Sequence, residues 1–166
     1  MRTIAALLSV LLIPSIGHAD ESLLGTMTAK WNTYIFVSTR MPQRDVVALA
    51  REASAAKATI VLNGFGGSDD TLMSTERYAT QINALCCGKR PAHWIIDPVI
   101  AQRYRVKSAP TFVVAHGESE NAGEYSAVAG DMSLSQALKF FAQGSRHQAA
   151  REYATQTYSS AFGNSE

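Results

Sequence analysis

The fold of this chain follows from one stretch, Ile95-Ile96-Asp97-Pro98-Val99-Ile100-Ala101-Gln102-Arg103-Tyr104-Arg105-Val106-Lys107-Ser108-Ala109-Pro110-Thr111-Phe112-Val113-Val114. Asp97-Pro98 is typical of a helix start, because Asp caps helices and proline is tolerated at the first helical position. A short helix is therefore predicted over Val99–Tyr104. Thr111–Ala115 has the length and the β-branched content of a strand.

Pro110 stands immediately before that strand. A proline has no N–H to donate to a sheet, so it belongs at the first residue of a strand or at an edge. Only about 5–6% of X–Pro bonds in folded proteins are cis, so the residues alone favour a trans bond. However, a short helix, then Val106-x-Ser108-x-Pro110-Thr111, then an apolar strand resembles the cis-proline segment of thioredoxin-like proteins. That resemblance implies a cis bond between Ala109 and Pro110.

The segments before this stretch alternate between strand and helix patterns. Tyr34–Ser38 is nearly all apolar, which is typical of a strand buried on both faces. Asp45–Ala56 is predicted to be an amphipathic helix whose inner face carries Val46, Leu49, Ala50 and Ala53. A second buried strand is predicted over Ala58–Asn63. The next helix is predicted over Thr71–Leu85, capped by Asp69 or Asp70, with an inner face of Leu72, Tyr78, Ile82 and Leu85.

The segments after the decisive stretch complete the pattern. His93–Ile96 is a short strand, and Glu124–Ala129 is predicted to return antiparallel to the strand at Thr111. Ser133 is predicted to cap a helix over Leu134–Gln143, and Arg146–Tyr158 has a more polar helical pattern. We therefore predict an α/β chain with a thioredoxin-like fold, in which a central mixed β-sheet is flanked by helices in a single domain.

The chain divides into four predicted regions. Residues 1–19 are predicted to be a cleaved signal peptide, because Arg2 precedes a short apolar run and Gly17-His18-Ala19 offers a small-residue cleavage site. Residues 20–31 are a lead-in, residues 32–145 the thioredoxin-like domain, and residues 146–166 a C-terminal helix and tail. The apolar run is shorter than the roughly 20 residues that a membrane span needs, and no later run is long enough.

Composition limits the function classes. The 166 residues are 46% hydrophobic and 17% charged. Removal of residues 1–19 would leave 14 basic and 14 acidic side chains. A chain with balanced charge gives no electrostatic reason to bind nucleic acid. The glycines of Gly64–Ser68 match neither common phosphate-loop spacing, so no small-molecule substrate is predicted.

The loop after the first strand contains no thiol. Thiol–disulfide exchange needs a reactive cysteine at the start of the following helix. Here that position is Ser38-Thr39-Arg40-Met41-Pro42, so exchange at the usual site is chemically impossible. The chain's two cysteines are Cys86 and Cys87. Adjacent Cα atoms lie about 3.8 Å apart, below the usual disulfide range of about 4.4–6.8 Å.

Three interpretations of Cys86 and Cys87 stay open. They can be an incidental pair with one side chain buried and one exposed. They can form a disulfide within the chain or to a partner, because export favours oxidation. They can also serve redox or metal chemistry, although adjacent thiolates lack the spacing of a structural zinc site. The histidines lie on different predicted elements, so we predict no metal, no cofactor and no catalytic residue.

The sequence Ile35-Phe36-Val37-Ser38-x-x-Met41-Pro42, together with Asp97-Pro98 and Ala109–Val114, resembles the TrbC family of F-type conjugative pilus assembly proteins. The resemblance covers about Tyr34 to Phe141. It implies a periplasmic, non-enzymatic assembly protein of a type IV secretion system, with a TraW-type assembly protein as partner. The alternative is an exported thiol-disulfide oxidoreductase or isomerase that uses Cys86 and Cys87.

The two proline-containing loops form the predicted binding surface. The loops at Met41-Pro42 and Pro110-Thr111 should lie side by side at one end of the sheet. Methionine adapts to irregular apolar partners, and open backbone beside a proline can accept an added strand. We therefore predict that Met41, Pro42, Pro110 and Thr111 bind an extended segment of a partner. The alternative is that both prolines only shape tight turns.

Overall fold

The structure is a computed structural model that describes residues 30–62, 64, 69, 71–117 and 124–163. Its elements, in chain order, are β1 (Trp31–Val37), α2 (Gln43–Ala56), β2 (Thr59–Leu62), α3 (Leu72–Cys86), β3 (His93–Ile96), α4 (Pro98–Arg103), β4 (Thr111–His116), β5 (Tyr125–Ala129), α5 (Leu134–Gly144) and α6 (Gln148–Phe162). The predicted signal peptide, nearly all of the lead-in, most of the Gly64–Ser68 loop and most of the loop before β5 lie outside the described residues.

The described strands form one mixed sheet in the order β3-β2-β1-β4-β5. β1, β2 and β3 run parallel, whereas β4 pairs antiparallel with both β1 and β5. This is the predicted thioredoxin-like arrangement in a single domain. The Ala109–Pro110 peptide bond is cis, as the resemblance implied. Among the described residues, no helix has the length and apolar character that crossing a bilayer requires.

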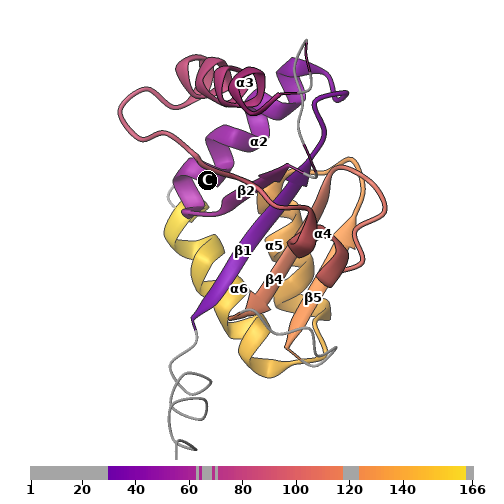
Figure 1. Cartoon of the computed structure of the whole chain (residues 1–166). Coiled ribbons are helices and arrows are strands. Elements are labelled where there is room, and N and C mark those ends of the chain that lie inside the picture. The colour runs from indigo at the N-terminus through magenta and orange to yellow at the C-terminus, as the bar shows by residue number, and fades with distance from the viewer. Residues whose placement is uncertain (1–29, 63, 65–68, 70, 118–123, 164–166) are drawn as a thin grey trace, which may run out of the picture.

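Helices cover the two faces of the sheet unequally. One face carries the larger core, to which α2, α3, α5 and α6 all contribute buried side chains. The other face carries a smaller core, in which Ile100, Ala101 and Tyr104 lie against Tyr34 and Phe36 of β1. Figure 1 shows α4 in front of the sheet, with α5 and α6 behind it. Both faces of β1 are therefore covered, as its nearly continuous apolar sequence predicted.

The sequence pattern accounts for several helix boundaries. Asp97 caps α4, because its side chain accepts hydrogen bonds from the N–H groups of Val99 and Ile100 at 2.8 and 3.0 Å. Ser133 caps α5 in a reciprocal pairing with Gln136. Asp97 and Ser133 are both the predicted cap residues. The predicted inner face of α2 is also confirmed, since its buried residues are Val46, Leu49, Ala50 and Ala53.

The predictions for α3 were partly wrong. Its N-terminal cap is Thr71, which exchanges hydrogen bonds with Ser74, rather than Asp69 or Asp70. Leu72 and Leu85 were expected on the inner face but are 52% and 60% exposed. The reason is that α3 packs mainly against α2 near the edge of the sheet, so only a narrow stripe around Ile82 becomes fully buried.

The C-terminal helix belongs to the same core as the rest of the domain. Ala150 and Ala154 of α6 are fully buried in the larger core, and the Thr33 and Tyr153 hydroxyls are hydrogen bonded at 3.1 Å. Trp31, assigned to the lead-in by sequence, is the first residue of β1 and lies beside Tyr153 with ring centroids 6.1 Å apart. The packed domain therefore extends past both predicted boundaries.

Tyr78 of α3 has a buried hydroxyl that makes no hydrogen bond with a described residue. Burial also raises the pKa of this hydroxyl above its ordinary value. Its ring packs edge-on against Trp94. We predict that Tyr78→Phe leaves the free energy of unfolding unchanged or raises it by up to about 1 kcal/mol, because it removes a desolvated group without a partner. Chemical denaturation would measure this.

The matched variant Tyr78→Ala separates the ring from the hydroxyl. It should destabilise the protein by about 2–3 kcal/mol, since it removes the ring that packs against Trp94. A loss of more than about 1 kcal/mol in Tyr78→Phe would mean that the hydroxyl has a partner in the folded protein.

Candidate functional site

The strand pairing brings the two proline-containing loops together. Phe36, near the end of β1, pairs with Thr111 at the start of β4. The segment that follows β1 and the segment that precedes β4 therefore meet at one end of the sheet. Between them lies a hollow of about 380 Å³, lined by Phe36–Arg40, Val106–Ala109, Leu62 and Gly64. We call this hollow the proline cleft.

Local structure fixes the β1 side of the cleft. The chain turns after β1 because the Met41 N–H donates to the Ser38 carbonyl at 3.0 Å, and the Arg40 N–H donates to the Ser38 hydroxyl at 3.2 Å. Pro42 then serves as the N-cap residue of α2, and its carbonyl accepts from the Asp45 N–H at 3.0 Å. The turn holds the main chain of Ser38–Arg40 along the cleft.

The β4 side of the cleft is held by a second set of contacts. The Val106 N–H donates to the Ala101 carbonyl at 2.9 Å, which ties the segment to α4. The Pro110 carbonyl accepts from the Gly130 N–H at 3.2 Å, beside β5. Between these two anchors, Lys107, Ser108 and Ala109 are exposed.

The four predicted binding residues have different environments. Pro42 is exposed and Pro110 is half-buried. The Met41 side chain packs against the larger core, and Thr111 is only 4% exposed, with its hydroxyl donating to the Ser108 carbonyl at 2.6 Å. Among the described residues that line the cleft, none of the four is included. The loops meet as predicted, but their neighbours form the walls.

Sequence reasoning missed Ser38–Arg40 and Lys107–Ala109 as the accessible surface. The predicted placement of the two proline loops side by side contained the signal, because the residues next to each proline then face each other at the same end of the sheet. The prediction named the prolines and the residues beside them, which shape the turns, and left out the residues that line the cleft between the turns.

The described lining of the cleft is polar and positively charged. Its described lining residues include the hydroxyls of Ser38, Thr39 and Ser108 and the cations Arg40 and Lys107, but no thiol, imidazole or carboxylate. A hydroxyl nucleophile needs a base within hydrogen-bonding distance, and disulfide exchange needs a thiolate. Among the described lining residues there is no thiol, and no hydroxyl is hydrogen bonded to a basic side chain.

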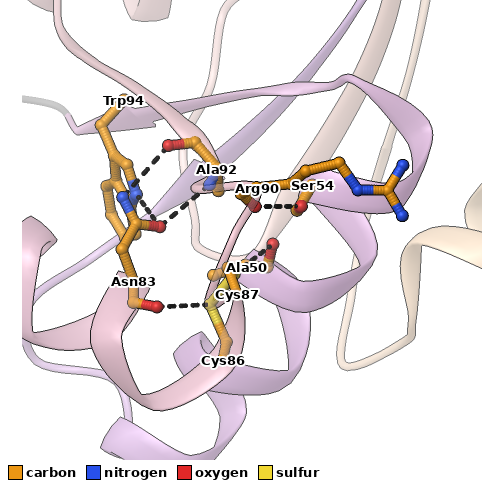
Figure 2. Close-up of a disulfide and its surroundings, with 8 residues drawn as sticks. All are labelled: Ala50, Ser54, Asn83, Cys86, Cys87, Arg90, Ala92 and Trp94. Carbon is orange, nitrogen blue, oxygen red and sulfur yellow. Dashed lines mark hydrogen bonds between the residues drawn. A yellow bond between two sulfur atoms is a disulfide. The ribbon is translucent and has the colours of Figure 1, made fainter.

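The cysteines lie away from this cleft. α3 ends at Cys86, directly before the turn that leads into β3, so the pair is at the sheet end where the parallel strands begin. The proline cleft lies where β1 ends. A disulfide joins Cys86 to Cys87 (Figure 2), which is the bridge within the chain among the three interpretations left open by the sequence. Both side chains are half-buried.

The disulfide packs against the helices around it. The Cys87 Sγ lies 3.5 Å from the Ala50 carbonyl oxygen of α2, and the Cys86 Sγ lies 3.9 Å from the Asn83 carbonyl oxygen. Since a disulfide sulfur carries no hydrogen, these approaches are packing contacts. The bridge therefore lies at the end of α3 beside α2, with each sulfur in contact with a main-chain carbonyl.

The fold and the cleft together define a thioredoxin-like domain without a cysteine in the loop that follows β1. A family model described as type-F conjugative transfer system pilin assembly protein matches residues 35–141. The chain belongs to this family, and the match covers the end of β1, the other four strands, α2, α3, α4 and most of α5.

No curated protein gives a significant match to the sequence. Among solved structures, the chain is similar to a secreted disulfide oxidoreductase of Mycobacterium tuberculosis that is described as homologous to E. coli DsbE. The two are 17% identical with a TM-score of 0.40, over 77% of this chain and 80% of that chain.

Proposed function

We propose that this protein is a non-enzymatic assembly protein of an F-type conjugative pilus and that it works by binding another transfer protein. Membership of the pilin assembly family supports the process. The proline cleft supports the mode of action, because its described lining offers hydroxyls, cations and main chain without a nucleophile and base pair. The observation that carries the proposal is that Ser38–Arg40 occupy the position at which a redox-active thioredoxin-like protein has its reactive cysteine.

We propose a periplasmic location and an assembly protein of the TraW type as partner. The predicted signal peptide at residues 1–19 supports export. The family resemblance implies the partner. In this proposal the partner lays an extended segment along Lys107–Ala109, beside Pro110, and pairs with its main chain as an added strand. Pro42 extends the contact surface, whereas Met41 and Thr111 hold the two loops in place.

One observation favours a second function. The Cys86–Cys87 disulfide is a redox-active group in principle, so an exported thiol-disulfide oxidoreductase or isomerase is the alternative. Its half-buried position between α2 and α3 argues against it, because disulfide exchange needs an approach path to one sulfur.

The experiment is a transfer assay in a donor strain that lacks this gene. Conjugation frequency and the number of pili per cell are measured after complementation with wild type or with Cys86→Ser/Cys87→Ser. We expect loss of transfer in the deletion and full rescue by both versions. Rescue by wild type alone, together with thiol-dependent turnover in an insulin-reduction assay, would favour the alternative. Normal transfer in the deletion strain would contradict the assembly role.

A further inference from the structure

The main chain on the β4 side of the proline cleft offers hydrogen-bond donors. The Val106 N–H is used by the Ala101 carbonyl, and the β4 ladder begins at Thr111. Between them, the N–H groups of Lys107, Ser108 and Ala109 donate to no described residue. All three residues are exposed and line the cleft.

Cations stand on both sides of the same cleft. Arg40 lies on the β1 side and Lys107 on the β4 side, and both are exposed. Neither makes an ion pair with a described residue, and the described lining contains no Asp or Glu. Arg105, two residues before Lys107, is also exposed and lines a separate hollow next to α4. The cleft therefore combines unpaired N–H donors with positive charge.

This combination selects acceptors that carry negative charge. Main-chain carbonyls of an extended peptide satisfy N–H donors in the way that an added strand does, and carboxylates satisfy arginine and lysine. A nucleic acid is the less suitable occupant, because the whole chain has a formal net charge of only +1 and the described lining of the cleft contains only two cations, Arg40 and Lys107. Complementary charge also speeds association and excludes basic segments.

We propose that the proline cleft binds an extended acidic segment of the partner protein. Carbonyl oxygens of the segment accept hydrogen bonds from the N–H groups of Lys107–Ala109, and its Asp or Glu side chains lie against Arg40 and Lys107. The proposal rests on the proposed function, in which this cleft docks an assembly partner, and adds the chemistry of the docked segment.

The test uses three fluorescent peptides of about six residues, roughly 20 Å when extended. They alternate valine with aspartate, asparagine or lysine. Anisotropy measures their binding to the full protein, to Arg40→Glu/Lys107→Glu, and to the control Arg51→Glu/Lys89→Glu. The control pair makes the same change in net charge at exposed positions outside the described lining of the cleft.

We expect the aspartate peptide to bind wild type at least about tenfold more tightly than the asparagine peptide, and the lysine peptide to bind least. Arg40→Glu/Lys107→Glu should lose about tenfold or more, and the control pair should lose less than about twofold. Amide resonances of Lys107–Ala109 should shift on titration of the aspartate peptide. Equal binding of the three peptides, equal loss in both double variants, or no binding would overturn the proposal. Equally tight binding of a single-stranded DNA oligonucleotide would overturn it too.

The transfer assay separates this inference from the function beneath it. If the deletion abolishes transfer and wild type restores it, while the aspartate peptide fails to bind, the acidic segment is wrong and the assembly role stands. If the deletion has no effect on transfer, the assembly role is wrong whatever the peptides do.

Discussion

Asn83→Ala is expected to destabilise the protein by about 3 kcal/mol. The Asn83 side chain joins the end of α3 to the start of β3 through three hydrogen bonds. Its Nδ2 donates to the Ala92 carbonyl at 3.2 Å, and its Oδ1 accepts from the Ala92 N–H at 3.0 Å and from the Trp94 Nε1–H at 3.3 Å (Figure 2). In Asn83→Ala the carbonyl and the N–H of Ala92 and the Nε1–H of Trp94 all lose their hydrogen-bond partner.

The position of these groups explains the size of the effect. Ala92 is 5% exposed, so water does not easily replace the lost amide. Each polar group left unsatisfied in such a site costs about 1–3 kcal/mol, and three groups lose their partner. Because Asn83 itself is half-buried, we expect the total to lie near the lower end of that range, at about 3 kcal/mol. Urea denaturation at neutral pH measures the change, and the melting temperature should fall by roughly 6–12 °C.

Two variants test the assignment to these bonds. Thr80→Ala lies on the exposed side of α3 and should change stability by less than about 0.5 kcal/mol. Trp94→Phe removes one of the three bonds and keeps an aromatic ring beside Tyr78. A double-mutant cycle between Asn83→Ala and Trp94→Phe should give a coupling of about 0.5–1.5 kcal/mol. Additive losses would show that the Asn83–Trp94 bond contributes nothing.

Glu52→Ala is expected to cost about 2 kcal/mol at neutral pH. The Glu52 carboxylate of α2 accepts hydrogen bonds from the N–H groups of Leu134 and Ser135, the first two residues of α5. These N–H groups have no acceptor within their own helix, and a negative charge also complements the positive end of the helix. Glu52→Gln keeps an oxygen acceptor and should lose less than about 1 kcal/mol.

The contribution of Glu52 to the free energy of unfolding also depends on pH, and the direction of its pKa shift sets the sign. Burial raises the pKa of Glu52 above 4.5, and the hydrogen bonds from Leu134 and Ser135 offset only part of that increase. The folded state therefore holds this proton more tightly than the unfolded chain. The extra stability that comes from this tighter proton binding is fully present below the unfolded pKa, and it is lost as the pH rises through the folded pKa. Wild type should thus lose stability relative to Glu52→Gln as the pH rises from about 4 through the raised pKa of Glu52.

Denaturation of both proteins across that range measures the difference. Glu76→Gln removes an exposed carboxylate from α3 and controls for the loss of one negative charge. A stability difference between wild type and Glu52→Gln that grows in favour of wild type as the pH rises would contradict burial as the dominant cause of the raised pKa.

The sequence was most informative where local and tertiary preferences agree. Asp97-Pro98 starts α4 because the cap and the proline act within one turn. The inner face of α2 was predicted correctly because α2 packs against β1, β2 and three other helices, so its whole apolar stripe becomes buried. The α3 prediction failed at Leu72 and Leu85 because a helix at the sheet edge has fewer neighbours to cover its apolar side chains.

The candidate site was predicted only in part. The absence of a thiol after β1 and the cis bond before Pro110 follow from residue identity and resemblance. The walls of the proline cleft do not, because Arg40 and Lys107 are far apart in sequence and meet only through the pairing of β1 with β4. The same is true of the Glu52 bond to α5 and the packing of α6, which join distant parts of the chain.

The sequence by itself determined the order of the elements, the thioredoxin-like class and the loss of the redox motif. Local caps, apolar periodicity and the presence or absence of a sulfur atom act over a few residues, so the sequence records them directly. The tertiary structure alone decided which side chains share the cleft, that α6 completes the core, and how Asn83 ties α3 to β3. These features depend on strand register and helix packing, in which a shift of one residue changes every contact.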